Sequence, residues 1–421
     1  MSTRVIYVYA DWKEINGPIL MGELRSDLTR GKEVFSFEYN PEWLKSGFSQ
    51  ILDPDLQLYT GPQYLGDEGK GNFGVFLDSS PDRWGRVLMK RKEAAHARKE
   101  GRAAKKLFEQ DYLLGVYDGH RMGGLRFKED IEGPFLNNDS RHAAPPWTSI
   151  RELEEISLKL ESDDSADDPD YLQWLNMIIN PGSSLGGARP KASVIDAQGE
   201  LWIAKFPSKN DEGDVGIWEY LAYKLAISSG ISMGECLARK FSSDHHTFLA
   251  KRFDRSPNSA RLHFCSAMTQ LGYSDGADSS IGASYLDIAE FLTENGAKVT
   301  EDLNELWRRI VFSICVSNTD DHLRNHGFLL TNKGWILSPA YDINPIENSS
   351  GLKLNINEDD NSLDLELAME VHEYFRLNKK EAENIISKVV RTVKKWREVA
   401  DKYGISRNQQ DLKATAFQVV N

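Results

Sequence analysis

Two side chains five positions apart form the most chemically suggestive pair in the sequence. Asp320 and Asn325 belong to the run Asn-Thr-Asp-Asp-His-Leu-Arg-Asn at 318–325. Kinase catalytic loops use this spacing: the aspartate accepts or orients a hydroxyl proton, and the asparagine oxygen helps to hold Mg²⁺. Asp321 competes for the first role, but it lies only four positions before Asn325. We therefore expect Asp320 to handle the proton.

A third oxygen ligand is expected to return toward this pair from farther along the chain. Short β-type runs at 328–331 and 335–338 flank a turn, which predicts a hairpin that leads to Asp342. In kinases such a hairpin separates the catalytic loop from the metal-binding aspartate of Asp-Phe-Gly, where this chain has Asp-Ile-Asn. Mg²⁺ prefers oxygen ligands, so Asp342 and Asn325 suit it.

The other half of such a site must hold a nucleotide, and residues 182–191 have a suitable composition. Glycines allow successive backbone amides to surround phosphate oxygens, and Arg189 and Lys191 add positive charge. An ordinary Gly/Ser loop would have the same composition. Lys205 and Glu219, which come later in the chain, favour a nucleotide-binding loop over an ordinary one. Lys205 ends a predicted strand and Glu219 lies on the next predicted helix, as in the lysine–glutamate pair of kinases.

With these parts in this order, the sequence resembles the HipA-type serine/threonine kinases, the toxins of bacterial type II toxin–antitoxin systems. The segments that carry the resemblance are Ser-Leu-Gly-Gly-Ala-Arg-Pro-Lys at 184–191, Ala-Lys-Phe-Pro at 204–207, Glu-Tyr-Leu at 219–221, Lys-Arg-Phe-Asp-Arg at 251–255, the run at 318–325, Pro-Ala-Tyr-Asp at 339–342, and Asp-Ser-Ser-Pro-Asp-Arg-Trp-Gly-Arg at 78–86.

The resemblance implies an α+β, two-lobed protein-kinase-like fold with an N-terminal β-rich subdomain and an all-helical C-terminal lobe. The expected divisions are residues 1–140 for the N-terminal subdomain, 141–255 for the kinase N-lobe with its phosphate loop, and 256–421 for the helical C-lobe. ATP and Mg²⁺ are the implied cofactors, with Asp342 and Asn325 holding the metal and 251–253 forming the hinge that pairs with adenine. The residues expected to bind the cofactors are Gly186, Gly187, Ala188, Arg189, Pro190, Lys191, Lys205, Glu219, Lys251, Arg252, Phe253, His322, Leu323, Arg324, Asn325, Tyr341 and Asp342.

The resemblance also implies a modification site in the phosphate loop. Members of this family autophosphorylate a serine that corresponds to Ser184, with the adjacent Ser183 left open as an alternative. A phosphate there would repel the phosphates of ATP, which makes it an inhibitory switch. Family members commonly carry Gln-Glu where this chain has Arg189 and Pro190, so its loop is expected to be stiffer and more cationic.

The partners implied by the resemblance are a protein substrate, such as an aminoacyl-tRNA synthetase, and a small DNA-binding antitoxin. The 421-residue chain has 51 basic and 64 acidic residues, a net charge of −13, which argues against direct binding to nucleic acid. DNA is therefore expected only through the antitoxin. No apolar run approaches the roughly 18 residues that span a bilayer, and no secretory leader is evident, so we expect a cytoplasmic protein without membrane contact.

Two other functions remain open from the residues alone. The same machinery could phosphorylate a small-molecule hydroxyl, as in aminoglycoside- or choline-type kinases. A non-catalytic protein that binds an antitoxin as a corepressor is the other alternative. A glycine-rich run at 69–74 matches a nucleotide fingerprint but is rejected, because a strand and a turn are expected after it rather than a helix.

Several elements are predicted from local pattern. Alternating or β-branched runs predict strands at 4–10, 34–39, 112–117 and 248–253, and a hairpin at 192–195 and 201–206. The basic stretch at 86–106 is expected to be a helix interrupted at Gly101, solvated or docking an acidic partner. The acidic run at 161–170 is expected to be a linker or a surface loop, and 379–400 a single long helix.

Overall fold

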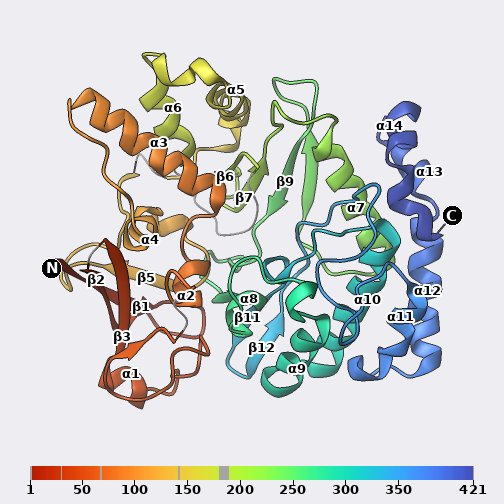
Figure 1. Cartoon of the computed structure of the whole chain (residues 1–421), viewed down its shortest axis with the longest axis horizontal. Helices are drawn as coiled ribbons and strands as arrows, with labels where there is room; N and C mark the ends of the chain where they lie inside the picture. Colours follow the sequence, from red (N-terminus) through yellow and green to blue (C-terminus); the bar gives the residue numbers. More distant parts are fainter. Residues whose placement is uncertain (1, 30, 67–68, 141–142, 180–188, 421) are drawn as a thin grey trace. The chain divides into compact units, whose positions relative to one another are not determined.

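The computed structural model describes residues 2–29, 31–66, 69–140, 143–179 and 189–420. These residues form two compact units, drawn in Figure 1. Unit 1 comprises Met1–Asn210, Lys240–Asp244 and Lys251–Cys265, and unit 2 comprises Asp211–Arg239, His245–Ala250 and Ser266–Asn421. The predicted phosphate-loop residues Ser183, Ser184, Gly186, Gly187 and Ala188 lie outside the described residues.

Unit 1 begins with a five-stranded antiparallel sheet in the order β4-β3-β2-β1-β5. Its strands are β1 (Ser2–Ala10), β2 (Ile19–Thr29), β3 (Lys32–Tyr39), β4 (Gln63–Tyr64) and β5 (Leu125–Lys128). Phe35, Phe37 and Tyr39 alternate along β3 and are buried on one face, as a period of two requires. Phe37 packs there against Phe76, with ring centroids 5.5 Å apart. The predicted strands at 4–10 and 34–39 are confirmed.

The helices of unit 1 correct two of the local predictions. They are α1 (Pro41–Lys45), α2 (Gly74–Asp78), α3 (Arg83–Lys99), α4 (Glu109–Gly115), α5 (Ile150–Leu160) and α6 (Tyr171–Ile179), with the 3-10 helices η1 (Asp118–His120), η3 (Trp147–Ser149) and η4 (Asp163–Asp167). The predicted strand at 112–117 is wrong, because α4 covers most of it. The Asp111 carboxylate accepts a hydrogen bond from the Phe108 amide at 2.9 Å and so fixes a helix start.

The second correction concerns the glycine-rich run at 69–74. The expected strand after it is wrong, since the chain enters the short helix α2. At the start of this helix the buried Asp53 carboxylate accepts a hydrogen bond from the Val75 amide at 2.9 Å. A carboxylate at this helix start would repel a phosphate group.

Unit 1 also contains the predicted hairpin, formed by β6 (Lys191–Ile195) and β7 (Leu201–Lys205). The register pairs Lys191 with Lys205 and Ile195 with Leu201. Gly199 closes the turn with a φ of +81°, which a residue with a side chain would adopt only with strain. The hairpin therefore brings both predicted lysines to its open end.

Unit 2 is built mainly of helices: α7 (Val215–Ser229), α8 (Ala267–Gln270), α9 (Tyr285–Asn295), α10 (Val299–Val316), α11 (Leu365–Glu370), α12 (Lys379–Val393), α13 (Trp396–Lys402) and α14 (Arg407–Leu412), with η5 (Ser279–Ile281), η6 (Leu323–Asn325), η7 (His372–Phe375) and η8 (Ala414–Val420). Its hairpin, β11 (Gly327–Thr331) with β12 (Gly334–Leu337), is the predicted one. The strand β8 (Cys236–Arg239) also belongs to unit 2, whereas the residues of β9 (Thr247–Lys251) and of β10 (Phe264–Ser266) are divided between the two units.

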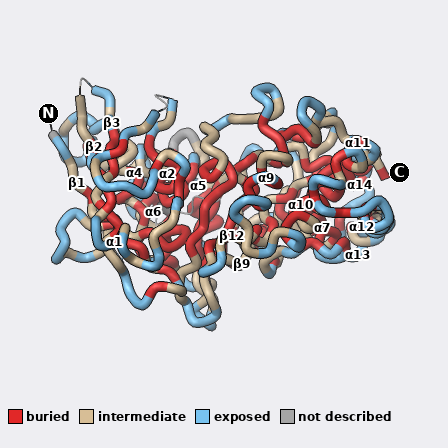
Figure 2. The backbone as a smooth tube through the Cα atoms, turned by 90° about the horizontal axis from the view of Figure 1, so that it is seen from below, coloured by how far each residue is buried: buried red, intermediate tan, exposed pale blue. Residues whose placement is uncertain are grey.

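The long helix α10 is a central, largely buried element of unit 2. Its apolar run from Ile310 to Val316 is entirely buried, and red marks these buried stretches in Figure 2. The single helix predicted at 379–400 is wrong, because the chain breaks between α12 and α13. At the break Trp396 turns inward and stacks on Phe417 at 4.4 Å. No helix among the described residues is long and apolar enough to cross a bilayer.

Candidate active site

The run at 318–325 follows α10 directly, and its conformation is fixed by short hydrogen bonds. α10 ends at Val316 and is followed by the C-cap residue Ser317, whose φ of +49° reverses the chain direction. The amide of His322 donates to the Asp320 carbonyl at 3.0 Å, and the amide of Asn325 donates to the His322 carbonyl at 2.8 Å. A loop held by its own backbone in this way can present side chains at defined positions.

The two adjacent aspartates of the loop have opposite environments. Asp320 is exposed. Asp321 is buried, and its carboxylate accepts a hydrogen bond from the Tyr285 hydroxyl at 2.7 Å and lies 3.0 Å from Nε2 of His326. Burial by itself would raise the pKa of Asp321, but the interactions with His326 and Tyr285 outweigh burial and lower it. Asp321 is thus committed to the interior, and Asp320 is accessible to a substrate.

Asn325 has the features expected of a metal ligand. Its side chain is buried, and its Nδ2 donates to the Asp320 carbonyl at 2.9 Å, which orients the amide. Its Oδ1 is also buried but accepts no hydrogen bond from any described residue. A buried oxygen without a donor is costly, so it is expected to meet a cation, a water or a ligand group. Asn325 therefore fits a role in holding Mg²⁺.

The segment that carries Asp342 is attached to the loop on both sides of that residue. The Tyr341 hydroxyl donates to the Arg324 carbonyl at 2.7 Å. Beyond Asp342, the amide of Asn344 donates to Oδ1 of Asn318 at 2.9 Å. These contacts bring the predicted residues at 320, 325 and 342 into one part of unit 2. Asp342 itself has a φ of +57°, a strained backbone of the kind that clusters at functional sites.

Asn344 is a candidate that the sequence prediction did not include. Its Nδ2 donates to the Asp342 carboxylate at 3.2 Å, while its buried Oδ1 accepts no hydrogen bond from a described residue. Buried Nδ1 of His322 likewise has no described partner. The signal that could have identified Asn344 is the Asp-x-Asn spacing, which puts two oxygen-bearing side chains two positions apart.

The remaining nucleotide candidates of unit 2 are fixed in regular elements. Leu323 and Arg324 lie in η6, where Leu323 is buried. Glu219 is buried on α7, a helix that the spacing of its apolar residues predicted correctly. Among the described residues, no three His, Cys, Asp or Glu side chains form a metal cluster. An ion held by Asp342 and Asn325 would need further ligands, such as phosphate oxygens.

In unit 1, the predicted phosphate-binding side chains already have protein partners. The Lys191 ammonium is buried 2.8 Å from the Asp82 carboxylate. The Arg189 guanidinium donates to the Phe206 carbonyl at 3.1 Å, and the Phe206 amide donates to the Pro190 carbonyl at 2.9 Å. The end of the predicted phosphate loop is therefore anchored to the end of β7.

The predicted hinge offers a nucleotide little through its side chains. The Lys251 ammonium pairs with the Glu200 carboxylate. The Arg252 amide donates to the Leu201 carbonyl at 2.9 Å, and its guanidinium is buried on Asp254. The ring of Phe253 packs on Phe264, with centroids 5.8 Å apart. An adenine base bound at this segment would therefore have to form its hydrogen bonds with backbone groups.

Comparison with known proteins identifies relatives of this chain. A family model described as the HipA-like C-terminal domain matches residues 183–397. The HipA toxin of Shewanella oneidensis MR-1, solved as a complex with HipB and its operator DNA, is 16% identical with a TM-score of 0.67, over 99% of this chain and 95% of that chain. This likeness confirms the predicted fold class, a two-lobed protein-kinase-like α+β fold.

Two further proteins match a smaller share of this chain. A protein of Haemophilus influenzae named "Putative kinase" is 26% identical over 183 residues, which are 38% of this chain. The match spans about half, 52%, of that curated relative. The Helicobacter pylori proinflammatory kinase CtkA is 16% identical over 56% of this chain and 91% of that chain, and its TM-score of 0.41 is too low to bear on the fold.

Proposed function

The chain belongs to the HipA-like C-terminal domain family, and from that premise we propose that it is an ATP- and Mg²⁺-dependent serine/threonine protein kinase. The observation that supports this best is the loop of unit 2. An exposed Asp320 carboxylate lies on a loop whose Asn325 has a buried oxygen to which no described residue donates, and the Asp342 segment is hydrogen-bonded to the same loop.

In this proposal Asp320 accepts or orients the proton of the attacking hydroxyl. Asn325 and Asp342 hold Mg²⁺, which when bound neutralises charge on the phosphates. Lys205, with Gly186, Gly187 and Ala188, contributes the phosphate contacts, and residues 251–253 contribute the hinge. Lys191, paired with Asp82, and Arg189, bonded to the Phe206 carbonyl, hold the end of the phosphate loop in place. Catalysis then comes from positioning and electrostatic stabilisation rather than from covalent chemistry by the protein.

We further propose that the chain phosphorylates its own loop at Ser184 and acts on a cytoplasmic protein, with a translation-related enzyme as the expected class. The Shewanella relative is described together with HipB and operator DNA. By analogy, a small DNA-binding antitoxin is the expected partner here, and DNA is reached only through it.

The test is phosphate transfer by the purified full chain with γ-labelled ATP and Mg²⁺. We expect label on the protein itself, located at Ser184 by mass spectrometry and lost in Ser184→Ala. Asp320→Asn should abolish labelling. Asp359→Asn is the matched control, because Asp359 is an exposed aspartate whose carboxylate bonds no described residue.

The alternatives predict different results in the same assay. Label on an added aminoglycoside or choline, with none on protein, would replace the proposal by a small-molecule kinase. No transfer to any acceptor, by protein that still binds an antitoxin, would indicate a non-catalytic corepressor.

A further inference from the structure

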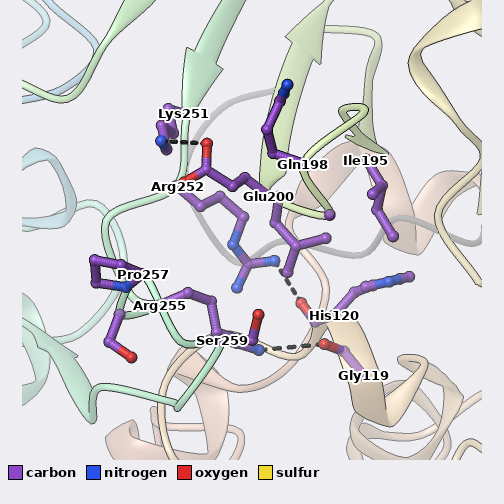
Figure 3. A pocket seen from close by; sticks show the side chains of 13 residues that line it. Gly119, His120, Ile195, Gln198, Glu200, Lys251, Arg252, Arg255, Pro257 and Ser259 are labelled. Atoms are coloured by element: carbon purple, nitrogen blue, oxygen red, sulfur yellow. Dashed lines mark hydrogen bonds and ion pairs between the residues drawn. The ribbon is translucent and has the colours of Figure 1, made fainter.

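A cavity of about 280 Å³ lies within unit 1, on the Arg252 side of the predicted hinge. Three segments line it: the end of η1, the turn between β6 and β7, and the chain after β9. Figure 3 shows the Arg252 guanidinium among these side chains. The lining residues are Gly119, His120, Ile195, Gln198, Gly199, Glu200, Leu201, Lys251, Arg252, Arg255, Ser256, Pro257 and Ser259. At about 30 Å³ per water, the space equals roughly nine waters, which suits a small metabolite.

The charge around the cavity is positive. Lys251, Arg252 and Arg255 line it, and Glu200 is the sole carboxylate among its lining residues. Asp254 lies just behind and pairs with both arginines at 2.5–2.6 Å. These five side chains together leave a net charge of +1.

The charged groups around the cavity are partly desolvated. Burial, followed by the charges of Arg252 and Arg255 among others, lowers the pKa of His120 to about 3. Burial also lowers the pKa of Arg255 to about 9, although the Asp254 carboxylate opposes that shift. Low dielectric strengthens the attraction of such cations for an anion that enters.

Polar groups that could contact an anion remain available at the cavity. Arg255 donates through its two terminal nitrogens to Asp254 and to the carbonyls of Gly119 and Arg121, but its Nε–H donates to no described residue. The side-chain amide of Gln198 and the hydroxyl of Ser259 likewise form no hydrogen bond within the described residues. Hydrogen bonds hold the Arg255 guanidinium in place, so a ligand would meet an Nε–H donor whose position is already fixed.

We propose that this cavity binds a small anionic metabolite through a phosphate or carboxylate group that contacts Arg255, Gln198 and Ser259. The three residues proposed to contact the anion differ from those proposed to bind ATP, although Lys251 and Arg252 of the predicted hinge also line the cavity. Binding here does not require the proposed kinase activity, and it adds a second ligand to the function proposed above.

The test is equilibrium dialysis of the full chain against labelled inorganic phosphate and, in a second arm, labelled citrate. Both arms contain a saturating non-hydrolysable ATP analogue, which occupies the proposed nucleotide site. Saturable binding of either probe is expected, and the preferred probe distinguishes phosphate from carboxylate recognition.

Two variants add one negative charge to the cavity without removing a structural contact. Gln198→Glu is isosteric and lies at an exposed turn. Ser256→Asp keeps an oxygen for the Ala260 amide, which the Ser256 hydroxyl now accepts at 3.1 Å. Each variant should weaken anion binding by about tenfold or more, because it places a negative charge in the cavity where the wild type has a neutral side chain.

Ser256→Asn is the neutral counterpart of the second variant, and Gln173→Glu places the same charge change as the first on an exposed position of α6. Both should bind like the wild type. Circular dichroism checks that each variant is folded. The proposal is overturned if neither probe binds in the presence of the ATP analogue, or if Gln173→Glu weakens the binding as much as Gln198→Glu does.

Discussion

Asp320 and Asp321 are neighbours with the same side chain, and substituting each by asparagine should have opposite consequences. Asp320→Asn is expected to abolish phosphate transfer and leave stability unchanged. Asp321→Asn is expected to lower stability strongly, because it removes the charge from a buried carboxylate that faces His326 at 3.0 Å and Tyr285 at 2.7 Å.

The structure sets the size of both effects. Asp320 is exposed and only its carbonyl bonds the described residues, so its loss should change the free energy of unfolding by less than about 0.5 kcal/mol. Removing one partner of a buried pair costs about 3–5 kcal/mol. Unit 2 has the size of domains in which a loss of 1 kcal/mol in the free energy of unfolding lowers Tm by about 2–4 °C. Asp321→Asn should therefore lower Tm by about 6–20 °C.

Thermal unfolding followed by circular dichroism measures the stability of both variants, and transfer of labelled γ-phosphate measures activity below the Tm of each. The assignment of roles is refuted if Asp321→Asn unfolds at the wild-type temperature, or if Asp320→Asn destabilises the protein as much as Asp321→Asn. Undiminished transfer by Asp320→Asn would refute the proton-handling role of that residue.

Three further results are expected. Asp342→Asn should raise the Mg²⁺ concentration needed for half-maximal transfer by about tenfold or more, because an amide binds the ion less strongly than a carboxylate; an unchanged requirement in a Mg²⁺ titration would contradict the metal role. The pKa of Asp321 in the folded protein lies below its ordinary value of 3.8. The stabilising contribution of its carboxylate is therefore fully present above about pH 3.8 and is lost as the pH falls through the lower pKa of the folded state. The stability advantage of the wild type over Tyr285→Phe in urea unfolding should therefore shrink below about pH 4, and a constant advantage would argue against it. Gly334→Ala should destabilise by about 1–3 kcal/mol, because φ is +119° and a Cβ would lie 2.6 Å from a backbone carbonyl; Gly404→Ala, with φ of +73° and open space, should lower Tm less.

Local sequence was sufficient for elements whose stabilising contacts lie close in the chain. The hairpins at β6–β7 and β11–β12 follow from short β-type runs around a turn, and α7 follows from apolar residues at helical spacing. The run at 112–117 was misassigned, because a short apolar run suits a strand and a buried helix equally well. The break before Trp396 depends on Phe417, and no pattern within 379–400 reveals that contact.

For the candidate site, the sequence by itself determined the order and spacing of the chemical groups: a glycine-rich loop, Lys205, Glu219, Asp320, Asn325 and Asp342. The tertiary structure alone decided which of two adjacent aspartates is exposed, that the buried Asn325 oxygen receives no hydrogen bond from the part of the chain that is described, and that Lys191 meets Asp82 from more than a hundred residues away. Spacing is a property of the chain, and it fixes what types of group can be near one another. Burial and pairing arise when distant segments exclude water together, so they become defined only in the folded protein.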